Sequence, residues 1–484
     1  MGLETNTANG CPSWSARAAA LAALTVLLTG CATVSTDAGG PTFWTATEAL
    51  TPGQRFELAK RSRPELIAFL RRFPKGADLH NHAGGATYSD YLLDGARAAG
   101  WVYDPVAITF VPTARDDTMT VDALEQDAAE LTRFFEALSM RGWYPNTTSG
   151  QDHFFQTFGH ITPSGRTPAD LLAELVPRNR YQNVNYLELM FNPLPHSLRA
   201  EFVQTGAGLD PNDLDAAFTR FEALIASDGV ARGITDSLDA LDAAVESRLQ
   251  LGVPVSDAAG APVHVRYIGS LHRGAPLDVF FSNAVAIFAG MQADERIVGL
   301  NIVAPEDHPR ARRNFETQMR MLDYLWRKFD SPNVTLHAGE LTLTLSPVES
   351  MWDRIRSSID VGHARRIGHG VSIGWEKDLP SLLEQMRRDG VLVEINLSSN
   401  ESILGIAGDD HPLPLFLQAE VPVCLTTDDE GVSRSNLTAE YVKAARRYEL
   451  DYAALKRMSR NCLEYAFLPG ESLFIDRDFS QLRP

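Results

Sequence analysis

The sequence has few cysteines and no repeats, the features on which disulfide-rich and repeat proteins depend. It contains only 4 cysteines in 484 residues, too few for a disulfide-based scaffold. Cys424 lies in an apolar run, and we expect it and Cys462 to be buried free thiols, with a bond between the two as the alternative. No internal repeat or low-complexity tract is present, which argues against repeat architectures.

Basic residues are also scarce. The 44 Lys and Arg residues are outnumbered by 62 Asp and Glu residues, which gives a formal net charge of -18, and they form no cluster. An acidic surface of this kind repels phosphate backbones, so binding to nucleic acid or to anionic lipid is not expected. We therefore expect the substrate to be a small neutral molecule.

The sequence does have the material for a large folded core. Its composition, 44% hydrophobic and 22% charged, is typical of a soluble globular protein. The length alone suggests two or three domains, but an α/β barrel with insertions can fill it as one unit.

The N-terminal segment predicts export. Residues 18–28 form an apolar run after Arg17, too short to span a bilayer but of the length of a secretory h-region. The run ends in Leu28-Thr29-Gly30-Cys31, which resembles the lipobox of bacterial lipoproteins, where the cysteine is lipidated. We expect a lipoprotein signal peptide at 1–30, a flexible tether at 31–47, a folded domain at 48–484, and a lipid anchor on Cys31 in a bacterial membrane, facing the periplasm or the cell exterior. An ordinary cleaved signal with an incidental cysteine, or a misassigned start, is the alternative, because the n-region is long and carries Glu4.

Short apolar runs of strand type recur along the rest of the chain. They follow a helical pattern between Thr51 and Pro74, are rich in β-branched residues, and are spaced widely enough for helical crossovers. Such runs are typical of parallel strands buried on both faces, and eight of them predict an α/β fold, a TIM or (β/α)8 barrel. The connections after the first two strands, 93–150 and 196–253, are long enough to be insertions, and the second has helical periodicity at 214–218 and 234–249. The eight runs are 77–82, 184–191, 263–268, 297–303, 334–337, 366–369, 391–397 and 421–426.

Polar residues gather at the carboxyl ends of these predicted strands. In a barrel, those ends form the catalytic face. A doubly wound open sheet is the alternative, but it needs a phosphate-binding glycine turn after the first strand, and Gly84-Gly85 lacks that spacing. The polar residues are His82, Asn192, Arg273, His337, His369, Asn396 and Asp428.

Two histidines at the end of the first strand indicate a metal site. His80 and His82 are two residues apart, so in a strand both side chains project from the same face. With His337 and Asp428 they make a donor set that suits a catalytic zinc with one position left for water, although other first-row metals accept the same donors. Satisfied core histidines are the alternative for the pair, and a structural histidine for His337 alone.

We predict acid–base or positioning roles for three further residues. Glu340 follows His337 by three residues, beyond a small Ala-Gly turn, where a carboxylate can shuttle protons beside the ion. His369, between two glycines, can orient the attacking water or stabilise charge, or it can be a buried structural histidine. Asp429 points away from Asp428 and can meet the substrate, unless the two form an ordinary acidic turn or helix cap.

Six segments carry a joint motif: 74–82, 186–193, 337–340, 366–370, 396–400 and 427–429. Taken in this order, they resemble the adenosine deaminase family, and the secreted adenosine deaminase-related growth factor type more than the compact cytosolic enzymes. The resemblance implies one zinc per chain on His80, His82, His337 and Asp428. It also implies that Glu340 donates a proton to the purine ring, that His369 positions the hydroxide and that Asp429 contacts the ring edge.

The same resemblance implies further substrate contacts. Phe154 and Phe158, four residues apart on a predicted helix, resemble the apolar gate over the family's pocket, with plain core packing as the alternative. Ala304 aligns with a family glycine whose amide meets the purine. Gly84 stands where the compact enzymes have an aspartate that contacts the ribose.

The resemblance thus predicts a zinc-dependent hydrolytic deaminase that converts adenosine or 2'-deoxyadenosine to inosine or 2'-deoxyinosine and ammonia. Another 6-aminopurine or a modified adenosine is the alternative substrate, and a non-catalytic barrel with a binding or signalling role is the alternative class. The expected partners are a small purine nucleoside and, through the lipid anchor alone, a membrane. The sequence does not indicate an oligomeric state.

Overall fold

Short strands with nearly continuous apolar sequences form the centre of the molecule. Their sequences are apolar because both faces of each strand are buried, which leaves no solvent-facing side for polar residues. The computed structural model describes residues 50–144, 148–161, 167–250, 263–472, 474–476 and 479–483. The predicted signal peptide, the tether and Cys31 lie outside these residues. No helix within the described ranges is long and apolar enough to cross a membrane.

The strands form two parallel four-stranded sheets, ordered β1-β4-β5-β6 and β7-β8-β9-β10. Parallel bridges join the sheets at both edges, between Leu300 and Val334 and between Asn81 and Asp428. At the second edge, the Asp428 N–H donates to the His80 carbonyl at 2.8 Å. The eight strands therefore close into the predicted (β/α)8 barrel, and the open-sheet alternative is wrong. Their bounds are β1 Gly76–His82, β4 Val184–Met190, β5 His264–His272, β6 Ile297–Val303, β7 Thr335–Ala338, β8 Arg366–His369, β9 Leu392–Ile395 and β10 Val423–Leu425.

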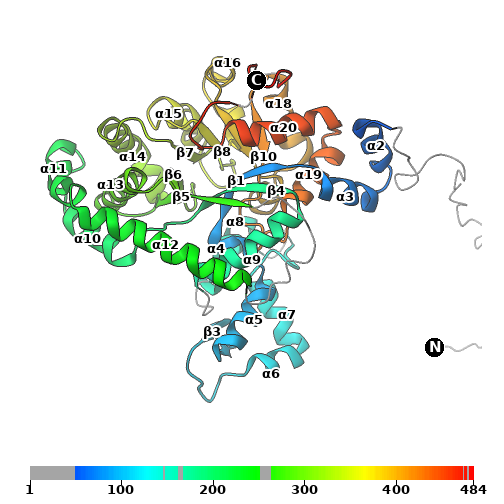
Figure 1. The fold of residues 1–484 in the computed structure, drawn as a ribbon, viewed down its shortest axis with the longest axis horizontal. Helices are drawn as coiled ribbons and strands as arrows, with labels where there is room; N and C mark the ends of the chain where they lie inside the picture. Colours follow the sequence, from blue (N-terminus) through cyan, green and yellow to red (C-terminus); the bar gives the residue numbers. More distant parts are fainter. Residues whose placement is uncertain are drawn as a thin grey trace, which may run out of the picture. The chain divides into compact units, whose positions relative to one another are not determined.

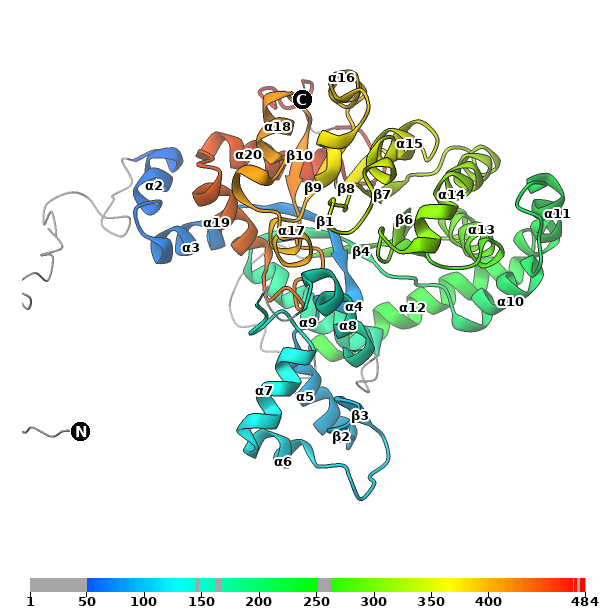
Figure 2. The ribbon, with the colours of Figure 1, turned by 180° about the vertical axis from the view of Figure 1, so that it is seen from behind.

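Helices surround the strands in the order that a (β/α)8 barrel requires (Figures 1 and 2). The helix after β5 is apolar on nearly all sides, because other helices cover the face that it turns away from the barrel. The elements before β1 and after β4 to β10 are α2 Pro52–Ala59, α3 Arg63–Arg72, α10 His196–Gly206, α11 Leu214–Ile225, α12 Asp228–Gln250, α13 Leu277–Ala293, α14 Pro309–Lys328, η1 Val348–Met351, α15 Arg354–Asp360, η2 Val371–Trp375, α16 Leu379–Asp389, α17 Leu397–Leu404, η3 Gly408–Asp410, α18 Leu413–Gln418, α19 Leu437–Arg447 and α20 Tyr452–Glu464.

The insertion after β1 is built around an apolar cluster, to which Ile403 and Val432 from the segments after β9 and β10 also contribute. Its helices α5 to α7 and a two-stranded antiparallel hairpin lie apart from the barrel strands in both views (Figures 1 and 2). Tyr103, Phe110 and Phe134 are buried at its centre, with ring centroids 5.4 to 5.8 Å apart. Its elements are α4 Ala83–Ala86, α5 Ser89–Ala99, β2 Val102–Asp104, β3 Thr109–Val111, α6 Val121–Gln126, α7 Ala128–Ala137, α8 Gly150–Ile161 and α9 Pro168–Tyr181.

Most structural predictions hold, with differences at the element ends. The helices predicted in the second insertion are confirmed as α11 and α12. Strand β5 runs four residues beyond its predicted end at 268, because residues 269–272 pair with β6. Cys424 and Cys462 are free and buried, so the predicted thiols are confirmed and the alternative bond is absent.

Candidate metal centre and active site

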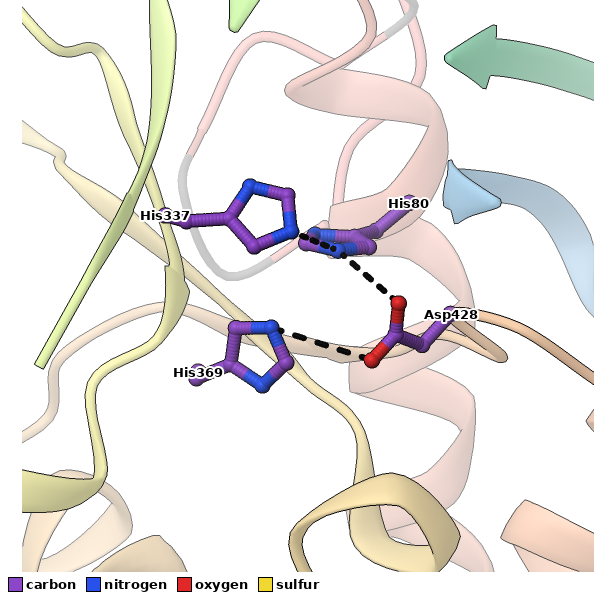
Figure 3. A group of neighbouring side chains, drawn as sticks. All are labelled: His80, His337, His369 and Asp428. Carbon is purple, nitrogen blue, oxygen red and sulfur yellow. Dashed lines mark hydrogen bonds and ion pairs between the residues drawn. The ribbon is translucent and has the colours of Figure 1, made fainter. Parts of the chain in front are cut away.

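The strand ends bring the four predicted metal ligands together. His80 and His82 come from β1, His337 from β7 and Asp428 from the segment after β10. The Nε2 atom of His337 lies 3.1 Å from the Nε2 atoms of both His80 and His82. Asp428 Oδ1 lies 3.3 Å from His82 Nε2 and 3.6 Å from His80 Nε2. Figure 3 shows the side chains of His80, His337 and His369 turned toward Asp428.

These separations fit a bound ion. Donors about 2.0 to 2.1 Å from a tetrahedral zinc lie roughly 3.4 Å from one another. Four of the six distances between the donor atoms are 3.1 to 3.6 Å and bracket that value. His80, His337, His369 and Asp428 form one group able to hold a metal, and His82, Asp428 and Asp429 form another.

Hydrogen bonds outside the group orient two of the imidazoles for metal binding. His80 Nδ1–H donates to Glu394 Oε2 at 2.7 Å, and His337 Nδ1–H donates to Asn301 Oδ1 at 3.0 Å. Asn301 Oδ1 also accepts from the backbone N–H of His337, which fixes the orientation of this amide. When both rings are neutral, their Nε2 atoms therefore face each other with lone pairs, an arrangement that a shared cation stabilises.

The electrostatics of the group also favour a cation. Burial lowers the pKa of His337 well below its ordinary value and lowers the pKa of His82 to about 4. Burial opposes charge on His80, but hydrogen bonds to Asp428 and Glu394 outweigh it and raise its pKa to about 10. Burial likewise opposes charge on Asp428, yet the surrounding histidines hold its pKa well below the usual range. The carboxylates thus favour positive charge at this point, which a divalent ion supplies.

Among the described residues, three of the twelve non-glycine residues with positive φ angles lie at the same strand ends. Ala304, His369 and Asp428 have φ angles of 82, 69 and 61°, in the left-handed region that favours glycine. Such strain clusters at functional sites. Ala304, aligned with a family glycine, therefore has the backbone conformation that a glycine adopts readily.

Glu340 is held beside the group by a buried charge cluster. Its backbone N–H donates to Glu306 Oε2 at 2.8 Å, and Glu306 Oε1 lies 3.4 Å from Arg273 and 3.3 Å from Arg354. Burial, then the charges of Asp428 and Glu306, raise the pKa of Glu340 well above its ordinary value. Burial thus favours the protonated form of the Glu340 carboxyl, the form that can donate a proton.

Asp429 approaches the group through a gap left by a glycine. A Cβ atom at Gly85 would lie 1.8 Å from Asp429 Oδ1, and this oxygen is buried without a hydrogen-bond partner among the described residues. Burial, then the charge of Asp428, raise the pKa of Asp429 well above its ordinary value. Gly84, in contrast, has nothing within 4 Å of the corresponding position.

The two phenylalanines of the expected gate lie on α8, with ring centroids 5.8 Å apart. Phe154 is buried in an apolar cluster with residues of the first insertion, and Phe158 packs against that cluster. This favours core packing for Phe154, and its gate role stays a prediction. Gln151 of α8 donates to Asp307 Oδ1 at 2.8 Å, which ties this helix to the segment after β6.

Several residues that complete the site were not among the predicted ones. Glu394 and Asn301 orient the ligands, while Glu306 and Arg354 surround Glu340. A charged residue inside an apolar strand, such as Glu394 in β9, is a signal that the sequence does offer, because a buried carboxylate requires a partner.

Comparison with known proteins gives a consistent family. The model of the adenosine deaminase family matches residues 145–473. The adenosine deaminase of Enterococcus faecalis is 32% identical over 152 residues, 31% of this chain and 41% of that protein. The adenine deaminase of Mesorhizobium japonicum is 28% identical over 207 residues, 42% of this chain and 55% of that protein. The chain thus matches less than two thirds of the length of these relatives.

Solved structures agree with the fold. The Arabidopsis ADAL structure complexed with GMP has a TM-score of 0.54 at 18% identity, covering 83% of this chain and 94% of that chain. The structure of the ADAL–IMP complex has a TM-score of 0.52 at 20% identity, with the same coverage. At this identity the likeness shows the fold alone. Because the family model covers more than half of the sequence, this chain belongs to the adenosine deaminase family.

Proposed function

We propose that this protein is a zinc-dependent hydrolytic deaminase of a 6-aminopurine compound, with adenosine and 2'-deoxyadenosine as the first candidates and one ion per chain. The observation that carries the proposal is the convergence of three imidazoles and a carboxylate beside a buried acid, with four of the six donor separations between 3.1 and 3.6 Å. His80, His82, His337 and Asp428 would hold the ion. An ion bound there would lower the pKa of water to about 7 and so would supply a nucleophile at neutral pH.

The residues of the chain then perform the proton transfers. Attack of water on the amino-bearing carbon forms a C–O bond, while the Glu340 carboxyl gives its proton to the adjacent ring nitrogen. The carboxylate that remains takes a proton from the added oxygen and passes it to the amino group, which leaves as ammonia when the C–N bond breaks. The second proton of the added oxygen returns to Glu340, which leaves a carbonyl in the product and restores the acid. His369 orients the attacking water, and Asp429 contacts the ring edge. The reaction consumes one water molecule and changes no oxidation state.

The substrate is a 6-aminopurine in this proposal because all of these relatives are named as deaminases, and adenosine and adenine, which two of the names contain, are 6-aminopurines. The relatives include adenosine deaminases, an adenine deaminase and the aminodeoxyfutalosine deaminase of Streptomyces coelicolor. Gly84 offers no side chain to a ribose hydroxyl, which favours a modified adenosine or a free base as the second candidate. A non-catalytic barrel is disfavoured, because such a protein has no use for a buried acid beside a complete ligand set.

Ammonia release tests the proposal. Purified protein of measured zinc content is incubated with adenosine, 2'-deoxyadenosine and adenine, and ammonia is quantified beside the ultraviolet change of the purine. We expect release from at least one nucleoside. Release from adenine alone would remove the nucleoside claim and keep the deaminase class. A zinc-loaded protein that releases no ammonia from any aminopurine would overturn the proposal.

We also propose that the protein is exported and anchored through lipidated Cys31, supported by the lipobox-like sequence before it. The test is metabolic labelling with a palmitate analogue in a bacterial host. Wild type should carry the label and sediment with membranes, whereas Cys31→Ser should lose the label and the membrane association. Labelling of the serine variant would contradict this assignment.

A further inference from the structure

Histidines around the metal centre differ in the group that faces Nδ1. His80 and His337 face hydrogen-bond acceptors, Glu394 Oε2 and Asn301 Oδ1, and so present Nε2 lone pairs to the site. In His369, Nδ1 faces the side-chain amide nitrogen of Asn400 at 2.9 Å. Its Nε2 atom points toward Asp428, 3.8 Å away, and has no hydrogen-bond partner among the described residues (Figure 3).

The orientation of the Asn400 amide follows from a second histidine. His411 lies between η3 and α18, and its Nδ1 accepts the backbone N–H of Leu413 at 3.1 Å. A backbone N–H can only donate, so the proton of a neutral His411 is on Nε2. That Nε2 lies 3.0 Å from Asn400 Oδ1, which must therefore be the oxygen end of the amide. Burial, then the charge of Arg447, lower the pKa of His411 to about 4, which keeps the ring neutral.

The amide nitrogen of Asn400 consequently donates to His369 Nδ1. The side-chain nitrogen of Asn396 also lies 3.5 Å from His369 Nδ1, and Asn396 Oδ1 accepts the Thr426 hydroxyl at 2.6 Å. The carboxylate oxygen Oε1 of Glu340 is 3.6 Å from His369 Nδ1, beyond hydrogen-bond distance. With Nδ1 accepting, a neutral His369 carries its proton on Nε2, directed at the metal centre.

We propose that His411, acting through Asn400, fixes His369 in the Nε2–H tautomer, so that His369 donates a hydrogen bond to the attacking water instead of binding the metal. A nitrogen that carries a proton has no lone pair for an ion. The groups that face Nδ1 thus leave His80 and His337 able to bind the metal and make His369 a hydrogen-bond donor. His411 and Asn400 are positioning residues, and the part that concerns water rests on the proposed function. The assignment also excludes neutral His369 as the base that first takes a proton from that water.

The tautomer can be measured without turnover. Protein with ring-¹⁵N histidine is examined by long-range ¹H–¹⁵N correlation NMR, and the His369 signals are identified by their loss in His369→Gln. We expect the Nε2–H pattern for His369 and for His411, in metal-loaded and in stripped protein. An Nδ1–H pattern at His369 would overturn the proposal whether or not the protein is a deaminase. The Nε2–H pattern in a protein without deaminase activity would sustain the tautomer assignment and remove the proposed function.

Variants test whether the hydrogen bonds from His411 to Asn400 and from Asn400 to His369, here called the relay, set the tautomer of His369. Asn400→Asp can only accept, so His369 should gain a proton on Nδ1, and kcat should fall by about 10² to 10⁴-fold with KM and metal content little changed, by analogy with a wrong-tautomer histidine. His411→Leu should allow both tautomers, whereas His411→Gln, which keeps a donor near Asn400, should restore the wild-type pattern. His363→Leu, which alters a histidine paired with Asp323 outside this relay, is the matched control. An unchanged His369 spectrum in Asn400→Asp would refute the relay.

Discussion

The buried carboxylate of Glu394 offers a direct test of how the protein holds its metal. This side chain accepts from His80 Nδ1 at 2.7 Å with one oxygen, and from Arg366 at 2.7 Å and Thr335 at 3.0 Å with the other. Arg366 also donates to Glu188 at 2.5 Å, and all of these side chains are fully buried. The change Glu394→Gln removes the charge that orients His80 while keeping the shape of the side chain.

Glu394→Gln should have two separate effects, one on zinc affinity and one on the free energy of unfolding. Losing the partner of a metal-bound histidine weakens metal binding by about 10 to 100-fold, or roughly 1.4 to 2.8 kcal/mol. For the apo protein, Arg366 keeps Glu188 as a carboxylate partner, so no charge is left unpaired. The free energy of unfolding should then fall by about 1.5 to 3 kcal/mol, the range of one hydrogen bond to a charged group, and not by the larger cost of a stranded ion.

Glu188→Gln is the matched control, because it removes the other carboxylate of Arg366 without contacting His80. Urea unfolding of the stripped proteins and zinc competition with a fluorescent chelator separate the two costs. Both variants should lose similar stability, and only Glu394→Gln should lose zinc affinity. Equal zinc affinity in the two variants would refute the role given to Glu394.

Three further predictions concern the acid, the glycines and the pH dependence of stability. E340Q should keep its metal and lose about 10² to 10⁴-fold in kcat, as expected for a general acid, and a variant that stays active would contradict this role. G85A should displace Asp429 and lower kcat/KM about tenfold or more, the equivalent of one hydrogen bond to a charged group, whereas G84A has room and should act like wild type. Equal rates in the two glycine variants would count against the Asp429 contact. Burial raises the pKa of Glu376 from 4.5 to about 7, so the native state binds the extra proton in this range. Urea unfolding of wild type relative to E376Q should therefore show stability decreasing as the pH rises from about 4.5 to 7, and an increase would be the wrong sign.

The barrel could be predicted because its strands are buried on both faces and read as separate apolar runs. Their ends were harder to predict, since pairing with a neighbour decides them, as residues 269–272 of β5 illustrate. The insertion after β1 was difficult to interpret, because its short helices and hairpin depend on packing around Phe134 and not on a strong local pattern.

The proposed ligands could be found because strand ends of a parallel barrel meet on one face, and the His80–His82 spacing shows on which side of β1 they project. The residues that orient them could not, because the contact between His80 and Glu394 joins positions 314 residues apart. The same holds for His411, which reaches His369 only through Asn400. Sequence patterns indicate which residues carry the chemistry, whereas hydrogen-bond polarity requires the folded arrangement.

The most direct measurement of the central claim is a metal titration of activity. Protein stripped of metal is titrated with zinc, and ammonia release from the best aminopurine is followed at each addition. Metal-dependent deamination at a single site predicts no release from the stripped protein, a linear rise, and a plateau at one zinc per chain. Release that is independent of added metal, or no release at full zinc occupancy, would contradict it.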